Sequence, residues 1–290
     1  MPVLSYVSPR SPGVRHYTRL SFENLSSKAP LKSLTRGLAK TGGRNARGVI
    51  TVRGRGGGAK KKCRLINTVR NKTKFSSGRL PLKQSLNAKV MSLEYAPHRN
   101  TTLALISYED GQREYIIAPR ALKEGSSLSL GPGSSRAIGT TRPMGLLPDG
   151  CVLHNVELNA GAGGKIARSA GTFAQLIAKT ASHVTLRLPS GEVRLLSKNC
   201  QATLGQVCNF IVQNRSLGKS GRKRWLGRRP SVRGLAMNPN DHPHGGGEGR
   251  SPIGRKAPVT PWGKIALGLK TRNTRKKSTM YILRSRHSKT

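Results

Sequence analysis

Positive charge is concentrated at the two ends of this 290-residue chain. Residues 1–86 carry 20 basic residues and 1 acidic residue, and residues 214–290 carry 20 and 2. Residues 87–213 carry 13 basic and 8 acidic residues, within a formal net charge of +42 for the whole chain. A surplus of this size opposes compaction by self-repulsion unless a polyanion neutralises it. Only the middle of the chain therefore has the charge balance of an ordinary globular domain.

The composition of the flanks also disfavours a compact fold. They are rich in Gly, Pro, Asn and Ser, and they hold too little apolar surface to offset the entropy lost on ordering. We therefore predict basic extensions at 1–41 and 206–290 that become ordered against a polyanion. Nucleic acid is the expected partner, because its phosphates release condensed counterions when Lys and Arg bind. An anionic membrane is the competing polyanion, but the sequence shows no apolar span, lipidation signal or basic amphipathic helix.

The middle of the chain has the pattern of two small β-modules. Short strands are predicted at 88–95, 101–108, 113–119, 151–158, 172–178, 183–188 and 192–197. Turn sequences such as EDGQ at 109–112 and PSG at 189–191 separate them. A glycine-rich break between Gly131 and Gly145 divides the modules, which we place at 42–131 and 132–205. Helix is scarce, and we predict only a turn or two near Ala202–Phe210.

Two glycine-rich segments superficially resemble nucleotide-binding motifs. Gly218-Lys219-Ser220 has the end of a phosphate-binding loop, but Gln213 stands where that motif requires Gly. GRGGGA at 54–59 runs into three lysines instead of an apolar helix, which argues against a dinucleotide site. We interpret these glycines, and those of GAGGK at 161–165, as letting the backbone approach phosphates while adjacent cations neutralise them. A merely flexible loop is the alternative for 161–165.

Two further features bear on catalysis and metals. The four cysteines, at 63, 151, 200 and 208, form no CxxC pair, so we expect free thiols and no metal site. MNPNDHPHGGGEGR at 237–250 holds Asp241, His242, His244 and Glu248, residue types that suit a metal site or an acid–base pair. The segment lies in a strongly basic tail and lacks an apolar core to make a dry pocket. We therefore favour a fixed loop that threads RNA.

Longer motifs resemble a known family. GGRNARGVITVRGRGGG at 42–58, EYAPHRN at 94–100, GGKIARSAGT at 163–172 and GRKRWLGRRPSVRGLAMNPNDHPHGGGEGR at 221–250 are similar to universal large-subunit ribosomal protein two, in its bacterial and organellar form. The resemblance covers nearly the whole chain. It implies a mainly β fold, with an oligonucleotide-binding-type β-barrel followed by an SH3-like β-barrel and long basic irregular extensions at both ends.

The resemblance also implies a function. It predicts a structural constituent of the large ribosomal subunit that binds domain IV of the large-subunit rRNA, supports subunit association and lies near the peptidyl-transferase centre, without catalysis of its own. The partners would be that rRNA, neighbouring ribosomal proteins and the small subunit, with no membrane and no small-molecule substrate. No cofactor is expected apart from Mg²⁺ ions associated with the rRNA.

The resemblance assigns RNA contacts to particular positions. The RNA-contacting arginines of the family's two barrels fall on Arg99 and Arg168, and its loop histidine falls on His242. Because a guanidinium can bridge two phosphate oxygens or stack on a base, Lys would not replace these arginines equivalently. With the neighbouring basic and polar residues, the predicted rRNA-binding set is Arg44, Arg47, Arg53, Arg55, Lys60, Lys61, Lys62, Arg99, Lys165, Arg168, Arg222, Lys223, Arg224, Trp225, Arg228, Arg229, Arg233, Asn238, His242, His244, Arg250, Arg255 and Lys256. Trp225 and Trp262 are each candidates for stacking on bases or for ordinary packing.

The compartment and two other function classes stay open. LPSGEVRLLSKNC at 188–200 and EGRSPIGRK at 248–256 look most like plastid members, so we expect a plastid ribosome, with a mitochondrion or a bacterial cytoplasm as alternatives. The N-terminal residues contain no apolar signal-peptide core.

A free-standing nucleic-acid chaperone would share the charge but would not need two β-modules. An RNA-processing enzyme would use His242 with Asp241 or Glu248. Segment 63–86 diverges most from the family.

Overall fold

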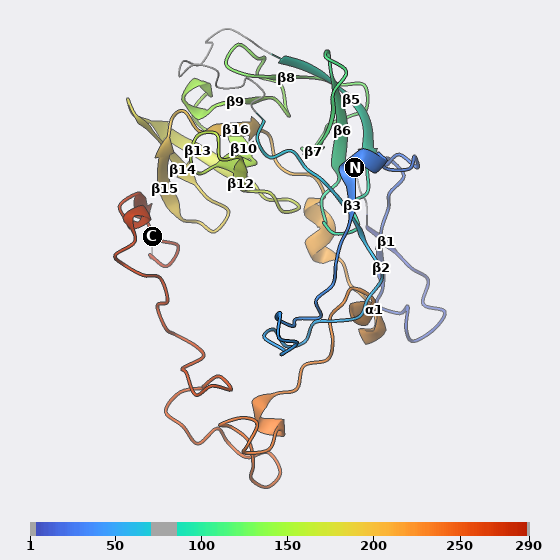
Figure 1. Ribbon diagram of the computed structural model, residues 1–290, viewed down its shortest axis with the longest axis vertical. Coiled ribbons are helices and arrows are strands. Elements are labelled where there is room, and N and C mark those ends of the chain that lie inside the picture. Colours follow the sequence, from blue (N-terminus) through green and yellow to red (C-terminus); the bar gives the residue numbers. More distant parts are fainter. Residues whose placement is uncertain (1–3, 71–85, 289–290) are drawn as a thin grey trace. The chain divides into compact units, whose positions relative to one another are not determined.

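The computed structural model describes residues 4–70 and 86–288 (Figure 1). They form two compact units. The first comprises 4–38, 60–70, 86–219 and 280–288, and the second comprises 39–59 and 220–279. Most of the divergent segment 63–86 lies outside the described residues.

The first unit is built from short strands with three short 3₁₀ helices. Its elements are β1 Leu4–Tyr6, β2 Thr18–Leu20, η1 Lys32–Leu34, β3 Thr35–Gly37, β4 Lys62–Arg64, β5 Leu86–Glu94, β6 Leu103–Tyr108, β7 Arg113–Ile117, β8 Ser127–Leu130, β9 Thr141–Pro143, η2 Met144–Leu146, β10 Val152–His154, β11 Val156–Glu157, β12 Gly164–Ile166, β13 Ala174–Lys179, β14 His183–Arg187, β15 Val193–Ser197, β16 Gln201–Leu204, η3 Phe210–Asn214 and β17 Ile282–Arg284. The second unit contains α1 Ser220–Trp225, η4 Gly234–Ala236 and η5 Lys277–Thr279.

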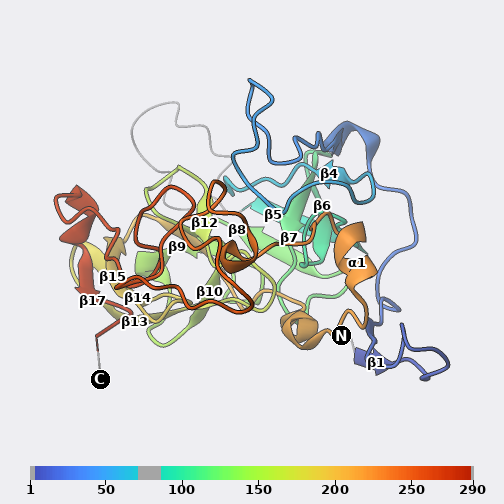
Figure 2. The same cartoon turned by 90° about the horizontal axis from the view of Figure 1, so that it is seen from below.

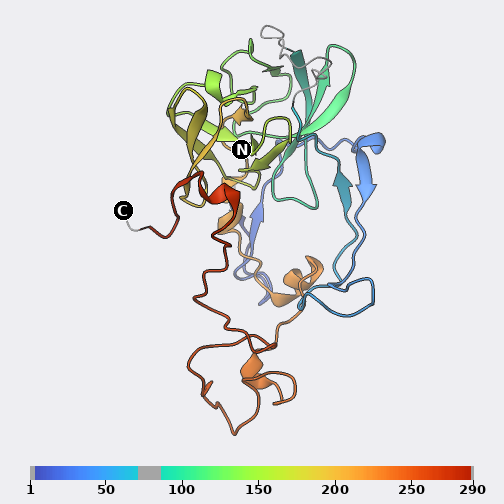
Figure 3. The same ribbon diagram turned by 60° about the vertical axis from the view of Figure 1, so that its left-hand side comes forward.

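Eleven of the strands form one continuous sheet in the order β17-β15-β14-β13-β10-β16-β9-β8-β5-β6-β7. Neighbouring strands are antiparallel except β8 and β9, which pair in parallel through Leu130 and Thr141. This pair joins the β5–β8 group to the β9–β16 group, and Figure 3 shows the two groups side by side. Strand β17, from near the C-terminus, pairs with β15 (Figure 2). A mainly β fold is thereby confirmed.

Each group of strands has its own hydrophobic core. Val90, Ile106 and Leu128 belong to a buried cluster of the first group, while Leu176 and Leu186 belong to a separate buried cluster of the second. In strand β5, buried and exposed residues alternate along the chain, so one face of the strand packs on the first of these cores. The predicted boundaries at 42–131 and 132–205 stay predictions, since one sheet runs through both modules.

The local turn predictions agree with the structure, whereas the helix prediction does not. The Tyr108 N–H donates to the Gln112 carbonyl over 2.9 Å, and Gly111 has φ of 77°, which closes the β6–β7 hairpin where Asp-Gly predicted it. The predicted helical turn at Ala202–Phe210 is wrong. Residues 201–204 form strand β16, because Ala202 is fully buried there and β16 pairs with both β9 and β10. A 3₁₀ turn begins only at Phe210.

Candidate nucleic-acid interface

Arg99 comes from the first β-module and Arg168 from the second, and the two side chains of this arginine pair lie near each other. Arg99 lies in the turn after β5, where its N–H donates to the Ala96 carbonyl over 3.1 Å, and Arg168 follows β12. Partial burial lowers the pKa of Arg168, and the nearby positive charge of Arg99 lowers it further. The Nε atoms of both arginines are buried, and neither has a hydrogen-bond partner among the described residues. A buried donor without a partner is costly, so this pair is poised for an anionic acceptor.

His98 lies in the positive field beside the arginine pair. The pKa of His98 is lowered by burial and then by the charges of Arg99, Arg64 and Lys61. Its Nε2 lies 3.4 Å from the sulfur of Cys63. His98 was not among the predicted residues, although it stands next to Arg99 in EYAPHRN, because an isolated histidine gives no signal of its surroundings.

Arg64 shows that proximity to this site does not by itself make a cation available to RNA. Its Nε lies 3.3 Å from Oε2 of the buried Glu94. The Tyr115 hydroxyl donates to the same carboxylate at 2.9 Å and accepts from the Leu31 N–H at 3.1 Å. A buried, hydrogen-bonded ion pair of this kind fixes β4 against β5 and leaves Arg64 neutralised.

The glycine loop at 161–165 is held by a carboxylate. The buried side chain of Glu157 accepts hydrogen bonds from the N–H groups of Gly161 and Gly163, each at 3.1 Å, and from Gln201 N–H at 3.0 Å. The N–H groups of Gly161 and Gly163 are therefore already used by Glu157, and the approach of this backbone to phosphates stays a prediction. In this loop the exposed side chain of Lys165 is what faces solvent.

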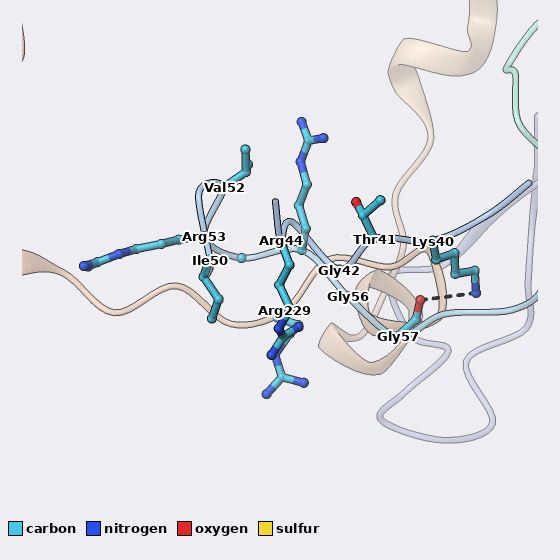
Figure 4. Close-up of a pocket in the computed structure, with 12 residues that line it drawn as sticks. Lys40, Thr41, Gly42, Arg44, Ile50, Val52, Arg53, Gly56, Gly57 and Arg229 are labelled. Atoms are coloured by element: carbon cyan, nitrogen blue, oxygen red, sulfur yellow. Dashed lines mark hydrogen bonds between the residues drawn. The ribbon is translucent and has the colours of Figure 1, made fainter. Parts of the chain in front are cut away.

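The second unit contains a strongly cationic pocket of about 510 Å³ (Figure 4). Its lining comes from two segments that are far apart in sequence, because Arg229 lies beside residues 40–57. None of the described residues that line it is acidic, and the lining includes Lys40, Arg44, Arg53, Arg55 and Arg229. A concave surface with five cations and a glycine-rich backbone suits the phosphates of a nucleic acid.

Close backbone packing builds this pocket. The Arg229 N–H donates to the Gly54 carbonyl at 2.9 Å, and the Ala59 N–H donates to the Trp225 carbonyl at 3.1 Å. A Cβ atom on Gly58 would lie 2.7 Å from the Gly227 nitrogen and from the Trp225 oxygen. Only Gly fits there, so the glycine run serves packing between two chain segments as well as approach to phosphates.

The histidine loop is a fixed structure. His242 is buried, and a Cβ atom on Gly234 would lie 2.5 Å from its ring. Its Nδ1 accepts the His244 N–H at 3.0 Å, and Nε2 of His244 accepts the Val259 N–H at 3.0 Å. A ring nitrogen that accepts an N–H carries no proton, so Nδ1 of His242 and Nε2 of His244 both act as acceptors in this loop. Desolvation and the nearby charges of His244 and Arg53 also lower the pKa of His242.

The predicted set divides by burial. Arg99, Arg168, Lys61, Arg222 and His244 are half-buried, and His242 is buried. The remaining members are exposed: Arg44, Arg47, Arg53, Arg55, Lys60, Lys62, Lys165, Lys223, Arg224, Trp225, Arg228, Arg229, Arg233, Asn238, Arg250, Arg255 and Lys256.

The structure brings only some of these residues together. Arg99, Arg168 and Lys61 gather in the first unit, whereas Arg44, Arg53, Arg55 and Arg229 line one pocket in the second. Lys40 and Thr41 also line that pocket and were not predicted. The positive charge of Lys40 next to the GGRNARG motif was the available signal.

No helix within 4–70 and 86–288 is long and apolar enough to cross a membrane. In the same residues, no group of three or more His, Cys, Asp and Glu side chains is arranged to hold a metal ion.

Comparison with known families assigns both halves of the chain. Residues 31–129 match the family model "Ribosomal Proteins L2, RNA binding N-terminal domain", and residues 137–263 match "Ribosomal Proteins L2, C-terminal domain". The two matches fit an oligonucleotide-binding-type barrel followed by an SH3-like barrel, as predicted. They also assign a structural, rRNA-binding role on the ribosome. With most of its length matched in this order, the chain belongs to the ribosomal protein L2 family.

Proposed function

We propose that this member of the family binds domain IV of the large-subunit rRNA, supports association of the two subunits and lies near the peptidyl-transferase centre. It performs no catalysis of its own. Its partners are that rRNA, neighbouring ribosomal proteins and the small subunit, and any Mg²⁺ at its surface belongs to the rRNA.

The arginine pair carries the proposal of site-specific RNA binding. Arg99 and Arg168 come from different modules, and each has a buried Nε without a partner among the described residues. Burying like charges side by side costs free energy unless an anion completes the site. A phosphodiester supplies oxygens that two guanidinium groups can share, and it explains why these two arginines differ from exposed cations.

The histidine loop supports a structural role over the alternative of RNA processing. A general base needs a free ring nitrogen within reach of the proton that it removes. Nδ1 of His242 accepts a backbone N–H, and the same is true of Nε2 of His244. The rings thus act as hydrogen-bond acceptors that shape the loop at 237–250.

We place the protein in a plastid ribosome. The motifs at 188–200 and 248–256 support this assignment through their resemblance to plastid members. Separating plastids, mitochondria and bacterial cells before detecting the chain with an antibody tests the compartment directly.

Sedimentation of native extract at about 1 M monovalent salt tests the function. The Debye length falls to about 3 Å under these conditions, so loosely bound cationic proteins dissociate. We expect the chain to stay with the large subunit, because the half-buried arginines are screened less by salt than exposed cations are. Footprinting on intact large-subunit rRNA should then protect domain IV.

A free-standing chaperone would behave differently in both measurements. It would move to the top of the gradient while the subunits stay intact, and it would protect no preferred RNA region over a random duplex. Either result would overturn the proposed function.

A further inference from the structure

Residues 258–266 of the second unit form a small hairpin with Trp262 at its tip. The Thr260 N–H donates to the Lys264 carbonyl at 2.7 Å, and the Ala266 N–H donates to the Pro258 carbonyl at 2.9 Å. Val259 and Ile265 form an antiparallel bridge between these two bonds. The hairpin is therefore closed by backbone hydrogen bonds along its length.

The turn itself is preorganised by its sequence. Gly263 N–H donates to the Thr260 carbonyl at 2.9 Å, which defines a four-residue turn with Pro261 and Trp262 in the middle. Pro261 fixes φ at the second position of the turn, and Gly263 adopts φ of 77° at the fourth. Thr260 Oγ1 also accepts the Lys264 N–H at 3.2 Å. The tip thus loses little further entropy when it binds a partner.

The hairpin is fastened at its base to the histidine loop. Val259 N–H donates to His244 Nε2 at 3.0 Å, which connects the strand leading to Trp262 with the loop at 237–250. Together these bonds hold the backbone on both sides of the indole in place.

The indole itself is left in solvent. Trp262 is 73% exposed, more than Trp225 at 60%, and the nearby Leu267 is 71% exposed. A large aromatic group held rigidly in water is typical of a binding contact, because Trp brings much contact area at a low entropy cost.

The charge around the hairpin identifies the chemistry of its partner. Residues 249–290 contain twelve Lys and Arg residues and no Asp or Glu. The partner must therefore be anionic and must offer a flat apolar face. RNA meets both conditions, since its phosphates are anionic and every base has a π face. An acidic protein surface meets the first condition but does not specifically require an aromatic side chain.

We propose that Trp262 is a stacking residue that binds an unpaired nucleobase of the RNA to which the chain is bound. The base must be unpaired, because bases within an RNA helix are already stacked on their neighbours. This inference rests on the proposed RNA-binding function and adds a specific contact to it.

Fluorescence tests the contact directly, because the chain has only two tryptophans. In full-length protein carrying Trp225→Phe, Trp262 is the sole indole. We expect its emission to be quenched by the chain's own full-length large-subunit rRNA, and not by a perfect RNA duplex at the same salt concentration. Bound rRNA with unchanged Trp262 emission would overturn the stacking contact while leaving RNA binding intact.

Affinity for the same rRNA separates stacking from apolar contact. Trp262→Leu should weaken binding by about 5- to 150-fold, the loss typical of one stacked base, whereas Trp262→Phe should retain most of the affinity. Leu267→Ala, which removes another exposed apolar side chain of this segment, should have little effect. The proposal would be contradicted if Trp262→Phe lost as much affinity as Trp262→Leu. It would also be contradicted if Leu267→Ala lost as much affinity as Trp262→Leu. If the unsubstituted protein does not prefer its rRNA to the duplex, the proposed function itself fails.

Discussion

At the scale of single residues, burial separates the cations of this protein into two kinds. Exposed residues such as Arg47 and Lys62 contribute mainly to the long-range field, which salt screens. Arg99 and Arg168 are half-buried and hold Nε atoms without partners among the described residues. A guanidinium keeps its charge in such a site, whereas an ammonium group is more readily neutralised by burial and cannot form the same planar pair of hydrogen bonds.

Arg168 should contribute one charge-assisted contact to RNA binding. Arg168→Ala should weaken binding to the large-subunit rRNA by roughly 2–3 kcal/mol, because a charge-assisted contact is lost. It should also reduce the slope of log affinity against log salt by about one phosphate contact. Arg168→Lys should lose affinity but keep more of the slope. Filter binding over a salt series measures both quantities.

Arg187 provides the matched control for this prediction, since it is an exposed arginine on β14 of the same module. Arg187→Ala should change the affinity by much less than Arg168→Ala. Equal effects of the two substitutions would show that the arginine pair is no more than part of the general field.

At the scale of elements, the glycine run at 54–59 is held by the segment that leaves α1. Backbone hydrogen bonds connect Gly54 to Arg229, Gly56 to Gly227 and Ala59 to Trp225. This contact gives a segment without regular secondary structure a defined path, and it positions the arginines of the pocket in Figure 4.

Substitutions at the adjacent Gly57 and Gly58 can distinguish the cost of steric overlap from the cost of backbone strain. Both Gly57 and Gly58 have positive φ, at 65° and 80°. A Cβ atom would meet nothing within 4 Å at Gly57, but it would lie 2.7 Å from backbone atoms at Gly58. Gly57→Ala should therefore cost only the strain of its φ, about 1–2 kcal/mol, while Gly58→Ala should also separate the two segments.

Limited trypsin digestion measures the difference between these variants. Cleavage after Arg53 and Arg55 should become markedly faster in Gly58→Ala than in Gly57→Ala, and RNA affinity should fall in the same order. Identical cleavage rates in both variants would refute the role assigned to the contact.

At the scale of the whole molecule, His154 lies where the two β-modules meet. It is buried, and its Nδ1 donates to the Gly205 carbonyl at 2.8 Å. The backbone of Ile117, from the first module, also hydrogen-bonds to it. Burial is the main reason that the pKa of His154 is lowered to about 4, and the nearby charge of Arg70 lowers it as well.

This shift predicts a pH dependence of stability. An unfolded histidine has a pKa of about 6.5, so the unfolded chain binds more protons than the folded chain between pH 6.5 and 4. The contribution of neutral His154 is complete above pH 6.5 and is lost as the pH falls toward 4. The loss should be on the order of 3 kcal/mol in the free energy of unfolding.

Urea denaturation of the RNA-free chain at several pH values checks the sign and size of this effect. The His154→Gln variant removes the titrating group, so its stability should vary less over the same range. An NMR titration that gave His154 a pKa near 6.5 would contradict the predicted pH dependence of stability.

The sequence by itself determined the local and compositional properties of this protein. Alternating side chains predicted β5, and Asp110-Gly111 predicted the β6–β7 hairpin, because both depend on neighbours along the chain. Net charge predicted a nucleic-acid partner, because charge is fixed by composition whatever the fold. The family resemblance then supplied the order of the two barrels, which the matches at 31–129 and 137–263 support.

Only the tertiary structure decided which groups are buried together and which are already bonded. In the structure, residues 201–204 form a strand, and the N–H groups of Gly161 and Gly163 donate to Glu157. Contact with a distant segment requires Gly at position 58. The tertiary structure also placed Arg99 close to Arg168 and left Trp262 in solvent. The physical reason is that desolvation and hydrogen-bond partners are set by residues far away in sequence, whereas charge and pattern can be read from each segment alone.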